Sequence, residues 1–264
     1  MPVFINCRDR LGCLRGLVAW LERARCQEIY LLDNDSTYEP LLDYYRESPH
    51  NVVLLGKNYG KNALWEAPGL FEKTGGRHFV YSDPDVVPID ECPTDALDRF
   101  RELLDRWSVY KVGFGLKWDD VPDHYPYKEE VEILERGNWE WPFERGAYLA
   151  PIDTTFGLYR PNGQPRPNEA IRTGYPYVAR HTAWYLDFDN LPEDELHYQQ
   201  HAATNTAWSL ETSHWTATTL TDAHRDQVAS LRAARGRRMQ RWTTQLKWRL
   251  YGRRRFRVGG APAG

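Results

Sequence analysis

Two aspartates separated by one residue follow an apolar run, in the segment Tyr81-Ser82-Asp83-Pro84-Asp85. Carboxylate oxygens at this spacing can bind a hard divalent cation, Mg²⁺ or Mn²⁺, that also contacts the oxygens of a diphosphate. A cation in that position acts as a Lewis acid for a leaving nucleoside diphosphate. Because the D-x-D pattern also occurs in ordinary turns and helix caps, its significance depends on where the fold places it.

Three other polar clusters follow short apolar runs, with the sequences Asn6-Cys7-Arg8-Asp9-Arg10, Asp33-Asn34-Asp35 and Lys57-Asn58. Arginine can bind phosphate through two N–H groups or stack on a base, so Arg8 and Arg10 are candidates for contact with a nucleotide. Lys61 is also a candidate for contact with a nucleotide. The alternative for all three residues is an ordinary ion pair at the surface.

The spacing of apolar residues predicts alternating strands and helices around these clusters. Strands are expected over 3–5, 28–32, 51–55 and 78–81, and helices over 14–21, 40–46, 62–73 and 94–107. Such alternation is typical of an α/β fold with a mostly parallel sheet flanked by helices. Ligands bind outside the carboxyl ends of the strands in these sheets, so the four polar clusters should converge at one edge.

The pattern changes after a further expected strand over 109–116. Strands are expected over 153–159 and 176–181, with a turn-rich loop over 161–167 between them and a helix over 193–203. The chain contains 11 Trp and 16 Tyr, which suits a cleft that holds sugars as well as it suits an aromatic core.

The order and spacing of three segments resemble the nucleotide-binding half of GT-A glycosyltransferases, especially the family-2-like bacterial enzymes. These segments are Leu32-Asp33-Asn34-Asp35-Ser36-Thr37, Asn58-Tyr59-Gly60-Lys61-Asn62 and Tyr81-Ser82-Asp83-Pro84-Asp85, and the resemblance covers residues 3–90. It implies a Rossmann-like GT-A sheet and a metal site that includes Asp83 and Asp85. The nucleotide-binding residues that we expect are Asn6, Arg8, Arg10, Asp33, Asp35, Lys61 and Asp83.

The second half resembles the same fold less closely. The segment from Ile152 to Leu158 is similar to the acceptor side of GT-A glucuronyltransferases, and the segment from Val178 to Thr182 resembles a late strand whose His181 completes the metal site. An inverting transferase needs a carboxylate base beside the acceptor hydroxyl. No x-E-D motif of the family occurs between Arg160 and His181, so the base is left open among Asp153, Glu169 and Asp187.

Charge divides the chain into an acidic body and a basic tail. Residues 225–257 contain 12 Lys and Arg against one acid, Asp226, in a chain whose net charge is −3. We expect a GT-A domain over 1–222, with a nucleotide-binding half over 1–116 and an acceptor half over 117–222. A basic amphipathic helix is expected over 223–258, with a disordered end over 259–264.

The tail predicts a membrane-surface partner. Met239, Trp242, Leu246 and Leu250 form an apolar stripe among arginines, and residues 239–257 could attract anionic lipid. No apolar run approaches the length of a transmembrane span, and charge near the start argues against a signal peptide. We therefore expect a cytoplasmic protein, peripheral at the inner face of the cell membrane. Nucleic acid is a poor partner for the acidic body.

Together these features predict a transferase that uses Mn²⁺ or Mg²⁺ to move a sugar from a nucleotide-diphosphate donor, with UDP favoured, to a glycan or lipid-linked acceptor. Polysaccharide biosynthesis is the process that such a reaction would serve. Two alternatives stay open: a phosphatase similar to the haloacid dehalogenases with Asp33 as nucleophile and Asp119 and Asp120 as its later acids, and a non-catalytic module that binds sugar nucleotides or membranes. The spacing of His197 and His201 suits a helical zinc pair, but no glutamate or third ligand accompanies it.

Overall fold

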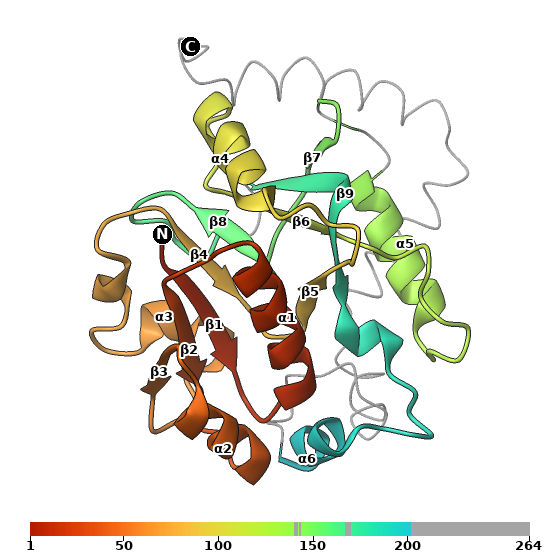
Figure 1. Cartoon of the computed structure of the whole chain (residues 1–264). Helices are drawn as coiled ribbons and strands as arrows, with labels where there is room; N and C mark the ends of the chain where they lie inside the picture. Colours follow the sequence, from red (N-terminus) through yellow and green to blue (C-terminus); the bar gives the residue numbers. More distant parts are fainter. Residues whose placement is uncertain (140–141, 143, 167–169, 202–264) are drawn as a thin grey trace.

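A computed structural model describes residues 1–139, 142, 144–166 and 170–201 of the chain. The expected basic helix over 223–258, the chain end over 259–264 and the candidate base Glu169 lie outside the described residues. Within them, a nine-stranded sheet forms in the order β3-β2-β1-β4-β8-β6-β9-β5, and β7 pairs with β9 (Figure 1).

The N-terminal half of the sheet is parallel. Its strands are β1 (Val3–Cys7), β2 (Ile29–Asp33), β3 (Asn51–Leu54) and β4 (Phe79–Ser82). The register pairs Cys7 of β1 with Asp33 of β2 and Ile5 of β1 with Ser82 of β4. The carboxyl ends of β1, β2 and β4 therefore lie side by side, which confirms the predicted convergence of polar clusters at one edge.

The C-terminal half of the sheet mixes strand directions. It contains β5 (Val86–Pro88), β6 (Lys111–Leu116), β7 (Ala147–Leu149), β8 (Gly157–Tyr159) and β9 (Ala170–His181). β8 is antiparallel to both β4 and β6, whereas β6 and β9 run parallel. Because β8 is antiparallel to β4, the loop that precedes β8 reaches the carboxyl end of β4.

Apolar layers cover both faces of the sheet, because alternate residues of a strand point to opposite faces. Val3 and Ile5 of β1 pack with α1 (Leu11–Arg23), α2 (Glu39–Glu47) and α4 (Ala96–Arg106) in the larger cluster. Phe4 packs on the other face with the short helix α3 (Ala63–Glu66) and its flanking turns. The chain is thus an α/β protein with a mostly parallel, mixed sheet flanked by helices.

Several expected elements differ from those observed. The helix expected over 62–73 is broken into η1 (Gly60–Asn62), α3 and η2 (Phe71–Thr74). Pro68 lacks an N–H group and Gly69 adopts a φ of +70°, so a continuous helix cannot pass through this pair. Of the strand expected over 153–159, only the last three residues form a strand, β8. The first part forms the loop at the end of β4.

Two helices complete the described chain, α5 (Lys128–Trp139) and α6 (Glu193–His201). In Figure 1, α6 lies at the same side of the molecule as the carboxyl ends of β1 and β2 and the start of α1. None of the helices in the described ranges combines the length and apolar character that a membrane span requires.

Candidate functional site at the carboxyl edge of the sheet

Amide side chains hold the loop after β3 against the ends of β1 and β2. Asn6 and Asn34 both donate from Nδ2 to the carbonyl oxygen of Gly60, at 3.2 and 2.9 Å. Asn34 also accepts a hydrogen bond from the Tyr59 amide at 2.7 Å. The Asn6 Oδ1 atom is buried and has no partner in the described structure, so a hydrogen-bond acceptor is left available beside this loop.

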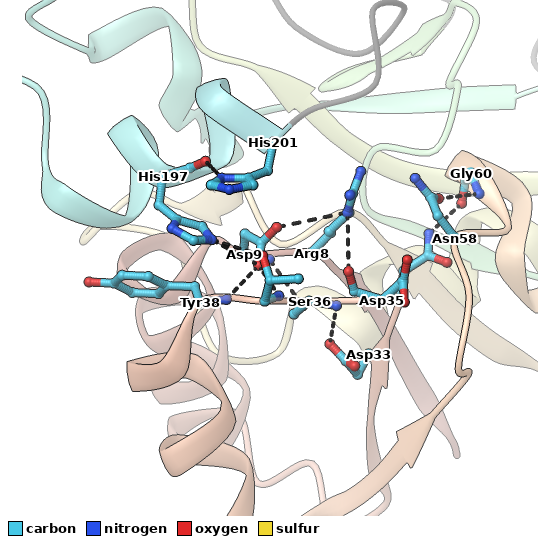
Figure 2. Close-up of polar contacts among 12 residues, drawn as sticks. Arg8, Asp9, Asp33, Asp35, Ser36, Tyr38, Asn58, Gly60, His197 and His201 are labelled. Atoms are coloured by element: carbon cyan, nitrogen blue, oxygen red, sulfur yellow. Dashed lines mark hydrogen bonds and ion pairs between the residues drawn. The ribbon is translucent and has the colours of Figure 1, made fainter.

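Asp9 organises the turn between β2 and α2, a role that the sequence did not reveal. It lies in the left-handed region at φ +58°, and its Oδ1 atom accepts hydrogen bonds from the amides of Thr37 at 2.6 Å and Tyr38 at 2.9 Å. Figure 2 shows this carboxylate between Arg8 and His197, with Asp33 and Asp35 on the neighbouring segment. Asp9 is in the cluster after β1, but only the fold brings it to Thr37.

The predicted nucleotide-binding residues Arg8, Asp33 and Asp35 lie within this turn region. Arg8 donates from Nε to the carbonyl oxygen of Asp35 at 3.3 Å. Asp33 is buried at the end of β2, and burial raises the pKa of its carboxyl group. Its Oδ1 accepts a hydrogen bond from the Ser36 amide at 3.3 Å. Asp35 is exposed at φ +70°, which fits a turn residue.

Asp83 lies at the end of β4 and contacts the loop that precedes β8. The Thr154 hydroxyl donates to Asp83 Oδ2 at 2.5 Å, and the Asp83 amide donates to the Thr154 carbonyl at 3.1 Å. Burial and the neighbouring carboxylate of Asp85 raise the pKa of Asp83 well above its ordinary value. A bound cation would relieve both effects, because it favours the ionised carboxylate.

Asp85 is buried and faces two cationic or potentially cationic groups. Arg10 Nη1 is 2.6 Å from Asp85 Oδ2, and His181 Nε2 is 3.7 Å from the same oxygen. Burial alone would raise the pKa of Asp85, but His181 and Arg10 outweigh it and lower this pKa. The other oxygen, Oδ1, is buried without a partner among the described residues. Arg10 is therefore a partner of Asp85 rather than a free phosphate ligand.

Helix α6 closes this side of the site. The sequence predicted a helix here but not its position against Arg10 and the start of α1. Glu195 Oε1 forms an ion pair with Arg10 Nε at 3.1 Å. The Arg10 guanidinium carbon lies 4.0 Å from the centroid of the Tyr198 ring. Asp194 Oδ2 accepts a hydrogen bond from the Gly12 amide at 2.7 Å, at the start of α1. An acidic helix start was visible in the sequence, but its distant partners were not.

The two histidines of α6 do not converge as a zinc pair. Their rings are stacked, with centroids 4.1 Å apart. His197 Nε2 lies 2.9 Å from the Thr37 hydroxyl, and His201 bonds to the carbonyl of His197 (Figure 2). The pair therefore joins α6 to the turn after β2.

The residues around Asp85 fit a hard divalent cation. The carboxylates of Asp83 and Asp85 are of the right chemical type, and the partnerless oxygen of Asp85 is an observation that a cation would explain. In the part of the chain that the structure describes, no three His, Cys, Asp or Glu residues form a complete metal-binding group. Mg²⁺ is often held by one or two carboxylates together with phosphate and water, so an incomplete protein shell is compatible with it.

The candidate bases differ in their surroundings. Asp153 precedes Thr154 in the loop beside Asp83, and its exposed carboxylate pairs with Lys61 Nζ at 2.7 Å. Asp187 is exposed and accepts a hydrogen bond from the amide of Asp189, as in a simple turn. The structure therefore brings Asp153 next to the Asp83 loop, whereas Asp187 accepts hydrogen bonds from Asp189 and Asn190 within its own turn.

A buried lysine under the same loop escaped the sequence reasoning. Lys111 donates from Nζ to the Asp153 carbonyl at 2.7 Å and to the Tyr159 hydroxyl at 2.9 Å. Its side chain is inaccessible to solvent, and burial lowers its pKa to about 7. A lysine at the start of an apolar strand gives no signal that it points inward.

The phosphatase alternative would use Asp119 and Asp120 as its later acids, but both residues have partners away from Asp33. Asp119 pairs with Lys117 at 2.6 Å, and Asp120 pairs with Arg180 at 2.6 Å and accepts a hydrogen bond from Tyr185 at 2.5 Å. These contacts give both acids partners outside the Asp33 turn.

Comparison with known proteins adds no assignment. Family models give no match to the chain, and curated protein sequences give none either. The function is therefore to be inferred from the geometry of the site itself.

Proposed function

We propose that this protein is a metal-dependent glycosyltransferase of the GT-A type, which moves a sugar from a nucleotide-diphosphate donor, with UDP favoured, to a glycan or lipid-linked acceptor. The observation that carries the proposal is the pair Asp83 and Asp85 at the end of β4, beside the polar ends of β1 and β2. Ligand sites occur at this edge of open α/β sheets.

The residues divide into two groups in this proposal. Asn6, Arg8, Asp33, Asp35 and Lys61 face the base, the ribose and the phosphates of the donor. Asp83, Asp85 and His181 hold Mn²⁺ or Mg²⁺, which supplies Lewis-acid stabilisation for the leaving diphosphate when it is bound.

Asp153 is the acceptor base that the local geometry favours. It is next to Thr154, which contacts Asp83, and its carboxylate is exposed, so an acceptor hydroxyl can reach it. The ion pair with Lys61 orients the Asp153 carboxylate toward the loop after β3. A general base of this kind accepts the proton of the acceptor hydroxyl as that oxygen attacks the sugar.

One part of the proposal concerns residues outside the described ranges. Attachment to an anionic membrane surface through residues 239–257 would bring the site close to a lipid-linked acceptor. A cytoplasmic location, peripheral to the membrane, and a role in polysaccharide biosynthesis follow from the same proposal.

Calorimetry with UDP, with and without Mn²⁺, tests the donor site. Asp85→Ala should abolish the Mn²⁺-dependent part of binding, because Asp85 is the buried carboxylate at the proposed cation site. Asp98→Ala, an exposed aspartate on α4, is the matched control and should bind UDP as the wild type does. UDP, GDP and dTDP all failing to bind would contradict the proposal.

The alternatives have their own readouts. Hydrolysis of a phosphate monoester that is lost in Asp33→Asn but retained in Asp85→Ala would instead identify a phosphatase. Mn²⁺-dependent nucleotide binding without transfer to any acceptor tested would identify a non-catalytic module.

A further inference from the structure

Arg10 occupies an unusual position between two buried carboxylates from distant parts of the chain. Its Nη1 contacts Asp85 Oδ2 at 2.6 Å, and its Nε contacts Glu195 Oε1 at 3.1 Å. The side chains of all three residues are at most 10% exposed. Ion pairs shielded from water interact far more strongly than surface pairs, so this bridge is a defining feature of the site.

The bridge occupies one of the oxygens at which a divalent cation would bind. Asp85 Oδ2 has Arg10 at hydrogen-bond distance, while Asp85 Oδ1 has no partner in the described structure. A guanidinium and a divalent cation repel each other when they share a carboxylate in a buried site. Occupation of Asp85 by one cation must therefore weaken its interaction with the other.

Glu195 gives Arg10 a second carboxylate partner. Glu195 and Tyr198 are three residues apart on α6, so both face Arg10 from the same side of the helix. Asp194 and His197 fix α6 independently, through Gly12 and Thr37. An Arg10 side chain displaced from Asp85 would still keep a charged partner and a stacking ring.

We propose that Arg10 is an internal counter-ion of Asp85 that competes with the divalent cation, and that Glu195 holds Arg10 when the cation takes its place. The inference depends on the metal site of the proposed function, and it adds an order of events. Arg10 keeps the affinity for the free cation low, so that the cation binds firmly only with a diphosphate that contributes further oxygen ligands. Arg10 is a positioning residue in this scheme, because it acts through Asp85.

The test is the affinity for Mn²⁺ alone, measured by calorimetry and by electron paramagnetic resonance of free Mn²⁺. Arg10→Met should lower the Kd for Mn²⁺ at least about tenfold, since a neighbouring arginine lowers a carboxylate's affinity for a proton by about one to three orders of magnitude and repels a divalent cation in the same way. Arg10→Lys should fall between the wild type and Arg10→Met, because lysine keeps the charge but cannot span both carboxylates.

Glu195→Gln should change affinity in the opposite direction. Without Glu195, Arg10 has Asp85 as its remaining charged partner in this bridge, so the Kd for Mn²⁺ should rise. If the bridge were purely structural, both Arg10→Met and Glu195→Gln would weaken Mn²⁺ binding. The proposal instead requires the Kd for Mn²⁺ to fall in Arg10→Met and to rise in Glu195→Gln. Arg46→Met is the matched control, because Arg46 pairs with Glu39 on the exposed surface of α2 and makes no contact with Asp85, and its Kd should stay within about twofold of the wild type.

A direct readout is the ¹⁵N side-chain signal of Arg10 Nε, assigned by its loss in Arg10→Lys. Addition of Mg²⁺ should shift this signal in the wild type, and should leave it unchanged in Asp85→Asn if displacement from Asp85 is the cause. UDP should tighten Mn²⁺ binding more in the wild type than in Arg10→Met.

Four results would overturn the inference: no Mn²⁺ binding to the wild type or any variant, an unchanged or higher Kd in folded Arg10→Met and Arg10→Lys, an unchanged or lower Kd in Glu195→Gln, or an Arg46→Met effect as large as that of Arg10→Met. Any of these can occur while UDP binding still depends on Mn²⁺, which would leave the proposed glycosyltransferase in place. Conversely, Mn²⁺ affinities that change as expected without any nucleotide binding would support the inference and contradict the proposed function.

Discussion

The Thr154 hydroxyl donates a hydrogen bond of 2.5 Å to the Oδ2 atom of Asp83, joining the loop before β8 to the end of β4. The Thr154 carbonyl also accepts the Asp83 amide. Thr154 thus fixes both the backbone and the side chain of the first aspartate of the D-x-D segment. This hydrogen bond orients the half-buried carboxylate of Asp83 at the end of β4.

Replacing Thr154 by valine should weaken Mn²⁺-dependent UDP binding. The variant keeps the side-chain volume but removes the hydrogen bond that Asp83 accepts, and with a bound cation holding Asp83 ionised, a bond to such a charged group contributes about 1.5–3 kcal/mol. The Kd for UDP in calorimetry should rise by roughly tenfold to a hundredfold.

Thr155→Val is the matched control for that measurement. The Thr155 hydroxyl is buried without a partner in the described structure, so its removal costs no hydrogen bond. UDP affinity should not change, and stability should stay equal or rise slightly. Equal losses of affinity in the two variants would show that Thr154 acts only through general packing of the loop.

Lys111 should make the stability of the protein depend on pH. Its folded-state pKa is about 7, whereas an unfolded lysine titrates near its ordinary value of 10.5. Between these values the unfolded state binds more protons, so stability rises with pH; the penalty is complete below pH 7 and disappears above about pH 10.5.

Chemical unfolding of the wild type and Lys111→Met at several pH values measures this effect. The difference in unfolding free energy between the two proteins should change by about 2 kcal/mol from pH 7 to pH 9, in favour of the wild type at higher pH. A constant offset from lost hydrogen bonds to Asp153 and Tyr159 does not alter that slope. A difference independent of pH would mean that Lys111 titrates normally in the folded protein.

Asp153 should matter for turnover more than for donor binding. Asp153→Asn removes the proposed base but keeps the shape of the side chain, so kcat should fall by about a hundredfold or more while the Kd for UDP changes little. Lys61→Met removes the partner of the Asp153 ion pair, which is about 60% exposed on both sides, so its effect on kcat should be much smaller, while the Kd for UDP should rise because Lys61 is a proposed donor contact. Comparable losses of kcat in the two variants would assign the ion pair, rather than the carboxylate, to the reaction.

Local patterns predicted the parallel half of the sheet well. The apolar runs that became β1, β2, β3 and β4 are short, and each ends in polar residues that periodicity and turn chemistry identify. The convergence of Asn6, Asp33 and Asp83 follows from the rule that parallel strands end at one edge. The break in the helix expected over 62–73 was also visible in principle, because Pro68-Gly69 is a strong helix-breaking pair.

The features that the sequence did not predict depend on contacts between distant segments. Arg10 and Glu195 are 185 positions apart, and nothing local to either residue indicates an ion pair. The Asp153 loop reaches Asp83 only because β8 inserts antiparallel between β4 and β6. The inward direction of Lys111 likewise follows from the packing of β6 against β8 and not from its neighbours in sequence.

The contact of Asp194 with the start of α1 should contribute to stability. Helix α1 has no side-chain hydrogen bond from its own N-cap residue Arg10 and no acid in its first turn, so Asp194 Oδ2 supplies the acceptor for the Gly12 amide. A carboxylate at a helix N-terminus satisfies a free amide and interacts favourably with the helix dipole.

Asp194→Ala should therefore lower the free energy of unfolding by about 1–2 kcal/mol, in the range measured for lost helix caps. Asp194→Asn keeps an acceptor oxygen without the charge, and it should lose only part of that stability. Asp189→Ala, in the exposed turn before α6, is the control and should stay within about 0.5 kcal/mol of the wild type. Protection of the first amides of α1 from hydrogen exchange, measured in the same three variants, localises the effect. Unchanged protection in Asp194→Ala would show that the contact does not stabilise the helix start in solution.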